Sequence, residues 1–553
     1  MLFGDSVTPK SSIPTVIRSI FSPRWVEGRP GLVSGGYDGC VSDRFHLECD
    51  VCIVGGGTGG TAAALALAGT DVRVLWITGP GPIGGQLTSQ AVPPDEHPWI
   101  ETTGCTATYR EFRNRVRAHY RLHGGITPAA QADPFLNPGG GWVSRLCFSP
   151  VVGVEVLHAM LGAPADISMQ DNWVPLAADV AGDRIRSVRF SRPGADDITV
   201  EAAFFLDATE LGDLIRATGT EYRLGAESQA QTGEPNALPG EPEPGNVQSF
   251  TWCAALTYEE GADHTIEEPA NYPFWRDHQP PHWPDKLLSF SMLNVQTGEP
   301  RHFPLFGNGG FNLFSYRQIA NPEIHKDGVP AATIMNWPMN DYALGSVVDV
   351  DPREAESHFE SAKDLTRSML YWLQKEHGYR GLRFAPEHTG TDDGLAAEPY
   401  IRESRRIEAL HTVCEQDIAA YTNPGLSVAP EMPMSVGVGA YRIDLHPSAN
   451  GHPTIDTSTL PFQIPLGSLI PVRVRNLIVA GKNLGVTHIT NGCYRLHPIE
   501  WNIGEAAAHL AASCLQQGTE PAGIHGSEQR FNEFRNRLWR AGVQTDWPRL
   551  RPL

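Results

Sequence analysis

A glycine-rich segment near the start of the chain restricts the fold more than any other feature of the sequence. Residues 50–54 form an apolar run rich in β-branched residues, which is typical of a buried strand, and the glycine-rich run 55–60 follows directly. The alanine-rich residues 61–68 are typical of a helix, and residues 72–77 have the composition of a second strand. The segment therefore predicts a strand, a tight turn, a helix and a second, parallel strand.

The glycines of this turn have the G-x-G-x-x-G spacing, which is meaningful in a strand–turn–helix context. The first allows the tight turn, the second lets the backbone approach a pyrophosphate, and the third lets helix and strand pack closely. The free N–H groups and positive dipole end of the helix would face the phosphates. We therefore predict a dinucleotide site, and a purely structural turn is the alternative. The predicted contacts are Gly55, Gly57, Thr58, Gly59 and Gly60.

One element of the usual dinucleotide pattern is missing. An acidic residue about 20 positions further along, at the end of the second strand, normally holds the adenosine ribose. Here that strand ends in Ile77, Thr78 and Gly79. The Thr78 hydroxyl or a backbone group would therefore have to contact the ribose.

The length and charge of the chain limit its organisation and its partners. At 553 residues it is too long for one compact core, so two or three structural units are expected. The net charge of −20 counts against nucleic acid or a membrane surface as a partner, and leaves a small-molecule substrate and a homo-oligomer open. We find no apolar run long enough to cross a bilayer and no secretory signal pattern, so a cytoplasmic location is expected.

The nine cysteines are odd in number and scattered, which fits a reducing compartment better than a disulfide framework. Cys49 and Cys52 spell C-x-x-C, but they lie on the predicted first strand, so buried thiols are favoured over redox chemistry. The sequence contains no paired Cys/His spacing for zinc, no H-E-x-x-H motif and no Fe–S cysteine cluster. We therefore predict no metal site.

Local patterns predict further elements along the chain. A meander of short strands is expected over 174–205, a surface loop or linker over 226–247, and a strand over 476–481. Helices are expected over 101–122, 354–376, 498–514 and 526–541.

Several of the later segments, taken together and in order, resemble one family. They are residues 83–88, 206–213, 399–406, 441–446, 463–471 and 476–484. With the glycine turn, they are similar to the FAD-dependent oxidoreductase family of the glutathione-reductase-like superfamily, the two-dinucleotide-binding-domain flavoproteins. The resemblance covers roughly residues 48–515 and is specific for FAD as the cofactor, but for no substrate.

The resemblance implies an α/β fold in which a discontinuous Rossmann-type FAD-binding domain carries an inserted α+β substrate domain. The expected parts are an N-terminal leader (1–48), the first part of the FAD-binding domain (49–225), the substrate or cap domain (226–460), the second part of the FAD-binding domain (461–520) and a C-terminal helical tail (521–553).

The same resemblance implies cofactor contacts beyond the turn. They are Gly84, Gly85, Gln86, Leu87, Thr88, Ala208, Thr209, Gly481 and Asn483. Two positions depart from the family pattern: Glu210 stands where many relatives have glycine, and Lys482 stands where the usual residue is acidic. Both departures concern contacts with the cofactor.

A helix N-terminus is expected at the flavin ring, because a flavin that exchanges a hydride at N5 builds negative charge near N1 and O2. Pro498 suits a first helical position, since it lacks the N–H that would go unpaired there. We therefore predict that the helix starting at Pro498 and Ile499 points at the flavin, and an ordinary packed helix is the alternative.

Histidines in the family-like segments are candidate bases, because oxidation of an alcohol or amine needs a group that takes the O–H or N–H proton. His488 is expected in the loop before the flavin helix, and His446 near the substrate face. His497 could cap the helix or carry a covalent flavin link. Arg402, in a cluster of arginines and acids, is the candidate anchor for a substrate carboxylate or for the reduced flavin, and an ion-paired face is the alternative. Residues 337–342 suit a small-molecule pocket or plain core packing.

The sequence therefore predicts a FAD-dependent oxidase or dehydrogenase that transfers a hydride from a small organic substrate to flavin N5. A flavin reductase or monooxygenase that uses NAD(P)H is one alternative, and the single good dinucleotide turn counts against it. A protein that holds FAD only as a structural ligand is the other.

Overall fold

The computed structural model describes residues 45–162, 166–281, 283–294, 297, 299–307, 309–326, 328–452 and 454–548. The predicted leader over 1–48 lies outside these residues except at its end, where the first strand, β1 (His46–Val54), begins. The other domain boundaries stay predictions.

A mostly parallel sheet forms around β1, because its central strands are apolar along most of their length. β1 lies between β2 (Val74–Ile77) and β6 (Ile198–Asp207), and β3 (Ile167–Gln170) lies beside β2; these pairs are all parallel. β21 (Leu477–Val479), from the far end of the chain, adds to β6 in parallel. The predicted strand–turn–helix–strand unit is therefore present, and a late strand joins the same sheet at β6.

Two antiparallel strands, β4 (Val174–Ala181) and β5 (Arg184–Ser191), continue the sheet beyond β6. They occupy the segment for which the sequence predicts a meander. Gly182 in the turn between them has φ +60°, a backbone conformation that two-residue hairpin turns need and that glycine adopts without steric cost.

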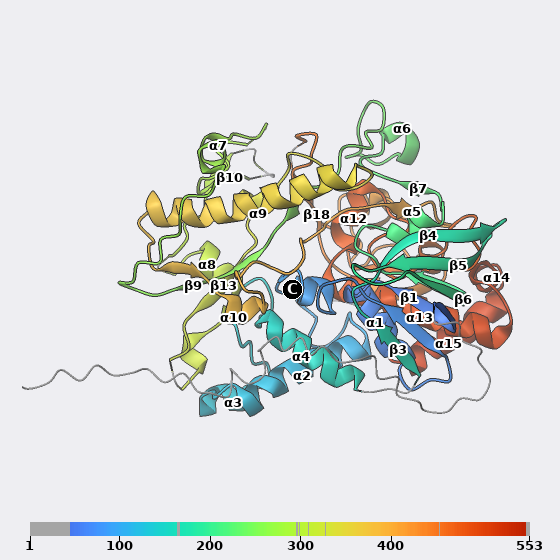
Figure 1. The fold of residues 1–553 in the computed structure, drawn as a ribbon. Helices are drawn as coiled ribbons and strands as arrows, with labels where there is room; N and C mark the ends of the chain where they lie inside the picture. The colour runs from blue at the N-terminus through green and yellow to red at the C-terminus, as the bar shows by residue number, and fades with distance from the viewer. Residues whose placement is uncertain are drawn as a thin grey trace, which may run out of the picture. The chain divides into compact units, whose positions relative to one another are not determined.

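Helices α1 (Thr58–Leu67) and α13 (His497–Gln517) pack against each other, and Figure 1 shows these first and last parts of the chain side by side. Their contact depends on glycine. A Cβ on Gly59 would lie 1.8 Å from the Ala480 carbonyl oxygen, and one on Gly504 would lie 2.0 Å from the Gly59 carbonyl oxygen. Close backbone approach therefore joins α1, the end of β21 and α13.

The middle of the chain builds a four-stranded antiparallel sheet covered by a long helix. Its strands, in spatial order, are β12 (Gln318–Ala320), β13 (Ala332–Met335), β9 (Ala254–Tyr258) and β15 (Leu382–Phe384). Helix α9 (Pro352–Lys375) lies above this sheet in Figure 1. Its buried Leu365, Met369 and Leu373 recur every four residues, so one apolar face packs into this core.

Shorter elements connect these layers. The other helices are α2 (Ala107–His123), α3 (Pro128–Ala132), α4 (Pro150–Leu161), α5 (Asp213–Ala217), α6 (Gln229–Thr232), α7 (Tyr272–Asp277), α8 (Leu313–Tyr316), α10 (Pro386–Thr389), α11 (Glu415–Ile418), α12 (His488–Tyr494), α14 (Pro521–His525) and α15 (Glu528–Arg540). The other strands are β7 (Tyr222–Arg223), β8 (Phe250–Thr251), β10 (Ser291–Leu293), β11 (Pro300–His302), β14 (Asp341–Tyr342), β16 (Arg406–Ile407), β17 (Ser435–Gly439), β18 (Ile443–Leu445), β19 (Ile455–Thr457) and β20 (Phe462–Pro465).

The helix predicted over 101–122 starts later than expected, because Thr106 caps α2. The Thr106 side chain accepts a hydrogen bond from the Tyr109 N–H, which satisfies a donor that the first turn leaves free. The preceding Gly104 has φ +83°, which no helical residue adopts. The cap therefore sets the start of the helix.

The segment 226–247, predicted as a surface loop or linker, is more structured than expected. It contains α6, and Glu227 and Glu234 within it are buried. The Glu234 carboxylate accepts hydrogen bonds from the Glu415 N–H at 2.8 Å and the Thr487 hydroxyl at 2.6 Å. The sequence predicted a loop here because a composition rich in Pro, Gly and Glu is typical of exposed loops, and composition alone does not predict these contacts.

The C-x-x-C pair of the first strand consists of two buried, free thiols, as predicted. Burial raises the pKa of Cys52 well above its ordinary value, so this thiol stays protonated.

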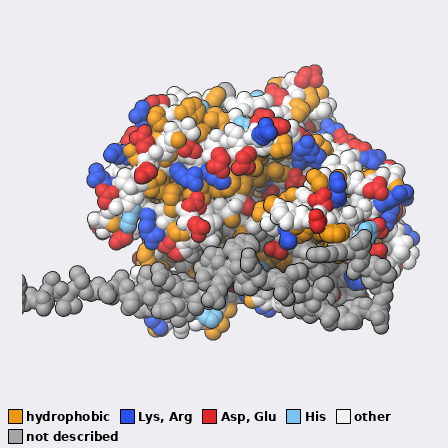
Figure 2. Space-filling view, in the orientation of Figure 1, with side chains coloured by type: hydrophobic (Ala, Val, Ile, Leu, Met, Phe, Trp, Pro, Cys, Tyr) orange, Lys and Arg blue, Asp and Glu red, His pale blue; other side chains and the backbone are white. Residues whose placement is uncertain are grey.

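None of the described helices is both long enough and apolar enough to cross a bilayer. On the face shown in Figure 2, acidic and basic side chains are interspersed among apolar ones.

Candidate active site

The glycine turn between β1 and α1 has the backbone geometry that a dinucleotide needs. Gly55 has φ +114°, and a Cβ there would lie 2.2 Å from the Ala208 carbonyl oxygen. A Cβ on Gly60 would lie 2.1 Å from the Gly55 carbonyl oxygen. Gly57 is the N-cap of α1, and no side chain caps the helix. The first-turn N–H groups of α1 can therefore bind a pyrophosphate.

The structure brings other predicted cofactor contacts to this turn. The Gly84 N–H donates to the Gly56 carbonyl at 2.8 Å, and the Thr58 hydroxyl donates to the Gly84 carbonyl at 3.0 Å. Asn483 Nδ2 donates to the Thr209 carbonyl at 2.8 Å. Segments that lie far apart in the sequence therefore form one site around the turn.

The second glycine loop closes against the first. A short 3-10 turn (Gly85–Leu87) lies there, and a Cβ on Gly85 would come within 2.7 Å of the Thr58 nitrogen. The Thr88 hydroxyl donates to the Ile83 carbonyl at 2.6 Å, so it stabilises its own loop. Thr78, at the end of β2, is also at the turn, 3.2 Å from where a Cβ on Gly56 would be.

The two departures from the family pattern contact each other. Lys482 Nζ and Glu210 Oε2 form an ion pair, and the Lys482 side chain is 1% exposed. Burial opposes the charge of Lys482, but Glu210 and Glu500 outweigh burial and raise the pKa of Lys482. A Cβ on Gly57 would lie 2.5 Å from Glu210 Oε1, so this carboxylate is beside the turn. Lys482 therefore neutralises an acid that would otherwise repel a pyrophosphate.

Glu500, in the first turn of α13, connects that helix to the second glycine loop. It accepts a hydrogen bond from Gln86 Nε2, and the same nitrogen donates to the Arg495 carbonyl at 2.8 Å. Burial raises the pKa of Glu500 to about 7, and the nearby Lys482 only partly opposes this shift. The loop and the start of α13 are therefore held together by a group that titrates near neutral pH.

The helix predicted to face the flavin ring begins one residue earlier than expected. His497 is its first residue and Pro498 its second, and the Ile499 N–H donates to the Leu496 carbonyl at 3.0 Å. The Asp95 N–H donates to His497 Nδ1 at 3.0 Å, and burial lowers the pKa of His497 to about 3. His497 is therefore a neutral acceptor that orders the chain at the start of α13.

Arg402, predicted as an anchor for the substrate or the reduced flavin, is held by protein groups. Its guanidinium pairs with Asp341 at 2.9 Å and donates to the Ser249 carbonyl at 3.0 Å, and the side chain is 1% exposed. The neighbouring Arg406 is also buried and pairs with Glu227 at 2.9 Å. These pairs assign both arginines to the internal structure.

His446 follows β18 and lies between two carboxylates. Its Nδ1 is 2.5 Å from Asp341 Oδ2, and its Nε2 is 3.6 Å from Asp444 Oδ2. Burial alone would raise the pKa of Asp341, but Arg402 and His446 outweigh burial and hold this pKa below its usual value. Asp341 is therefore an ionised partner for His446.

His488 is the first residue of α12, whereas the sequence analysis expected it in a loop. Thr487 caps this helix by accepting a hydrogen bond from the Thr490 N–H, which is why the helix starts here. His488 Nδ1 is 2.8 Å from Glu403 Oε2. Burial alone would raise the pKa of Glu403, but His488 and Arg406 lower it below its usual value. His488 is therefore oriented by an ionised carboxylate.

Both predicted histidines line one pocket of about 170 Å³. The segment that the sequence analysis predicted to be a linker supplies part of its wall, including Glu227, Asn236 and Asn246. His446 and His488 therefore face a common space from two different parts of the chain.

Hydrogen bonds connect this histidine pocket to the dinucleotide turn and to α13. Ser404, next to Glu403, donates to Asn483 Oδ1 at 2.6 Å. Arg495, which precedes α13, donates to the Asp444 carbonyl at 3.0 Å. Asp444 and the neighbour of Glu403 are thus bonded to residues at or beside the predicted cofactor-binding segments.

Sequence reasoning missed most of the partners that orient the histidines. Asp341 lies in the segment 337–342, which was predicted as a pocket wall or core packing and not as a partner of a histidine, and Glu403 was expected only beside the arginines. The Gln248 N–H donates to Glu403 at 3.0 Å, and Gln248 Oε1 accepts from the His446 N–H at 3.4 Å; nothing in the local pattern marked this residue. Asp444 could have been found, because it lies two positions before His446 in the same family-like segment, and residues two apart in extended chain share a face.

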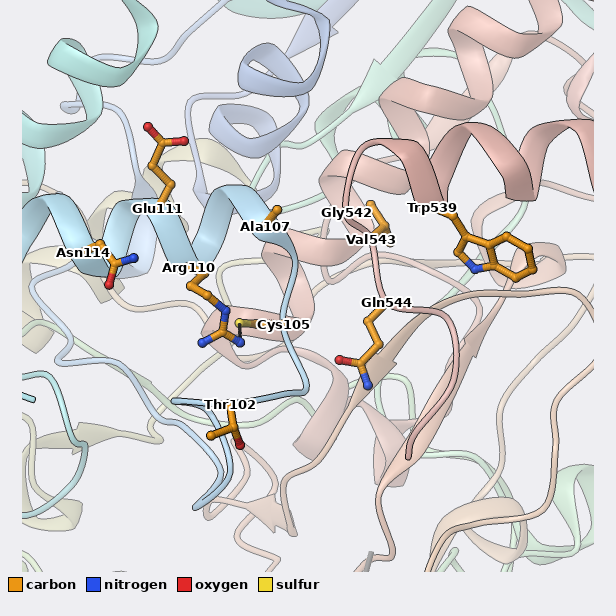
Figure 3. Close-up of a pocket in the computed structure, with 10 residues that line it drawn as sticks. All are labelled: Thr102, Cys105, Ala107, Arg110, Glu111, Asn114, Trp539, Gly542, Val543 and Gln544. Atoms are coloured by element: carbon orange, nitrogen blue, oxygen red, sulfur yellow. Dashed lines mark hydrogen bonds between the residues drawn. The ribbon is translucent and has the colours of Figure 1, made fainter. Parts of the chain in front are cut away.

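A larger pocket, of about 490 Å³, lies between α2 and the C-terminal helix α15. Figure 3 shows Arg110 and Cys105 on the α2 side, and Trp539 and Gln544 on the other. Arg110 Nη2 donates to Cys105 Sγ at 3.1 Å, and burial raises the pKa of that thiol to about 11. The thiol is therefore protonated at neutral pH, and no residue of the glycine turn or the histidine pocket lines this space.

The sequence matches one family over most of its length: a profile described as "FAD dependent oxidoreductase" matches residues 50–538. No curated protein matches the chain.

Solved structures share only a distant likeness with this chain. The p-nitrophenol 4-monooxygenase PnpA from Pseudomonas putida DLL-E4 is 12% identical, with 88% of this chain and 83% of that chain covered and a TM-score of 0.34. A myxobacterial chondrochloren halogenase, described as a variant of FAD-dependent halogenases, is 12% identical, with 89% and 79% covered and a TM-score of 0.28. A geranylgeranyl bacteriochlorophyll reductase-like protein from Thermoplasma acidophilum is 11% identical, with 90% and 85% covered and a TM-score of 0.29. Scores this low support no argument about the reaction.

Proposed function

The chain belongs to the family of FAD dependent oxidoreductases, and we propose that it oxidises a small organic substrate, with His488 as the base that takes the substrate's O–H or N–H proton. FAD, when bound, accepts the two electrons that leave the substrate C–H bond. The observation that carries the proposal is one pocket lined by two histidines, each paired with a buried carboxylate. A histidine oriented in this way is a common general base.

The contacts of His488 favour it over His446 as the base. Its Nδ1 faces Glu403, which favours the tautomer with the proton on Nδ1 and a lone pair on Nε2. Among the described residues, none is a hydrogen-bond partner of His488 Nε2, so this lone pair is free to accept a proton. In His446, by contrast, Nδ1 is bonded to Asp341 and Nε2 lies 3.6 Å from Asp444 Oδ2, so a carboxylate lies beside each ring nitrogen. His446 is therefore proposed to orient the substrate.

The topology supports the finer fold proposal, a split Rossmann-type domain of the glutathione-reductase-like kind. β21 pairs with β6 in the same sheet as β1, although the chain between β6 and β21 forms the four-stranded sheet and α9. A parallel sheet built from the two ends of the sequence is what a discontinuous domain with an insertion requires. That the substrate is a small molecule, and not nucleic acid or a membrane, remains a proposal from the acidic net charge.

The test uses the FAD-loaded protein under anaerobic conditions. A panel of small alcohols and amines, half of them carrying a carboxylate, is screened for bleaching of the flavin absorbance. With the best reductant, the rate of bleaching is measured against pH for the wild type, His488→Asn, His446→Asn and His452→Asn. His452 lines the same pocket but pairs with Glu243, which is only partly buried, so its variant is the matched control.

We expect His488→Asn to bleach about 10²–10⁴ times more slowly than the wild type and to lose the limb of the pH profile that reports the base. His452→Asn should behave as the wild type. An unchanged rate and pH profile in His488→Asn would show that this residue is not the base. Rapid bleaching by NAD(P)H, with no response to any alcohol or amine, would favour a reductase or monooxygenase.

A further inference from the structure

Arg317 is a half-buried cation, and two nitrogens of its guanidinium have no hydrogen-bond partner among the described residues. It lies between α8 and β12, and the Ile334 N–H of β13 donates to its carbonyl at 3.1 Å, which fixes its backbone. The side chain is 13% exposed, and its Nε and Nη1 atoms are buried without a hydrogen-bond partner. A guanidinium that loses water without gaining an acceptor is costly, so its position indicates an acceptor supplied by a ligand.

The other two arginines of this region differ from Arg317. Both terminal nitrogens of Arg402 donate to the protein, and so do those of Arg495. The carboxylate nearest to Arg317, that of Asp95, is 3.9 Å from Nη1, which is beyond hydrogen-bond distance. Arg317 is therefore the arginine of this group that retains the capacity to bind an anion.

Arg317 lies near the start of α13. Asp95 carries the carboxylate nearest to Arg317, and its backbone N–H donates to His497, the first residue of that helix. Arg317 and Arg495 both add to the effect of burial in lowering the pKa of His497, so both lie near the helix N-terminus. Arg495 donates to the Asp444 carbonyl, and the Asp444 carboxylate lies 3.6 Å from His446 Nε2. A ligand held by Arg317 would therefore lie near the start of α13.

We propose that Arg317 binds the carboxylate of the substrate, so that the enzyme acts on small carboxylic acids. The inference rests on the proposed function. The planar guanidinium matches the geometry of a carboxylate and can bind both of its oxygens. Burial raises the pKa of the adjacent Asp95, in spite of the nearby Arg317 and Arg495. The Tyr441 hydroxyl donates to Asp95 at 3.3 Å and holds it aside.

A binding experiment tests this without turnover. The protein loaded with oxidised FAD is titrated with benzoate and with benzamide, its neutral counterpart, while the flavin absorbance is followed to equilibrium. We expect benzoate to give a saturable difference spectrum and benzamide to give none at the same concentrations. Arg317→Gln should weaken benzoate binding about 30-fold or more, because the anion loses its charged partner. Arg301→Gln, at an exposed arginine of β11, should bind benzoate as the wild type does.

The variants also separate the substrate from the flavin as the source of the anionic oxygen. If Arg317→Gln lowers the flavin midpoint potential but leaves benzoate binding unchanged, Arg317 serves the reduced flavin and the proposal is wrong. It is equally wrong if the wild type shows no response to benzoate. FAD content and Tm of each variant show whether it is folded. Arg317→Lys keeps the positive charge but loses the planar pair of nitrogens, so it should weaken benzoate binding about fivefold. The titration involves no proton transfer, so its outcome is independent of His488.

Discussion

Removing the charge of Lys482 should weaken FAD binding, because Glu210 would then lie unneutralised beside the dinucleotide turn. Lys482→Met keeps the length of the side chain and removes its positive charge. Two unit charges about 6 Å apart interact by about 3 kcal/mol at an effective dielectric constant of about 20. The Glu210 side chain is 21% exposed, so solvent screening reduces the repulsion of a pyrophosphate to about 1.5 kcal/mol, or roughly tenfold in Kd.

The assay is a titration of apoprotein with FAD, followed by quenching of flavin fluorescence. The double variant Glu210→Gln/Lys482→Met should bind FAD nearly as the wild type does, because neither charge remains. Lys363→Met removes a lysine that pairs with Glu360 on α9, and this control should have no effect. The reasoning is refuted if Lys482→Met binds FAD with unchanged Kd, or if adding Glu210→Gln does not restore its affinity.

Other perturbations test the packing and the buried charges. Gly59→Ala should lower the free energy of unfolding by about 3 kcal/mol in urea, because its Cβ would meet a backbone oxygen at 1.8 Å, whereas Gly240→Ala, which has open space, should change it little. The pKa of Glu500 is raised from 4.5 to about 7, so its contribution to apoprotein stability is full below pH 4.5 and is lost as the pH rises through 7. In paired urea titrations, the free energy of unfolding of the wild type should therefore fall by about 3 kcal/mol over this pH range relative to that of Glu500→Gln. If the two proteins show the same dependence of unfolding free energy on pH, the raised pKa is wrong. Arg402→Met should lower the unfolding free energy by about 3–5 kcal/mol, seen as a fall in Tm, because Asp341 loses its buried cation; an unchanged Tm would show that the pair contributes nothing.

The dinucleotide part of the fold was predictable because its signals are local. The strand before Gly55, the glycine spacing and the alanine-rich helix lie within one short segment, and each needs only its neighbours in sequence to be recognised. The structure pairs β1 with β2 as expected. The ends of longer elements were less accurate, since the start of α2 depends on a single capping side chain, that of Thr106.

The candidate site was only partly predictable, because its chemistry depends on contacts between distant segments. His446 and His488 could be singled out from their motifs, but the carboxylates that orient them come from elsewhere: Asp341 is more than 100 positions from His446. Arg402 carried the stronger sequence signal as an anchor, yet Asp341 occupies it, and Arg317 gave no signal at all. Which arginine is paired can be known only once the chain is folded.

The most direct test of the central claim, that the turn over 55–60 binds FAD, is an absorbance spectrum of the purified protein before and after acid precipitation. Gly57→Val is measured in parallel, since a side chain at Gly57 would meet Glu210 at the turn. We predict flavin bands in the wild type that pass into the supernatant, and little or no flavin in Gly57→Val. A wild type that is colourless and cannot be reconstituted with FAD, or a Gly57→Val protein with full flavin content, would contradict the account.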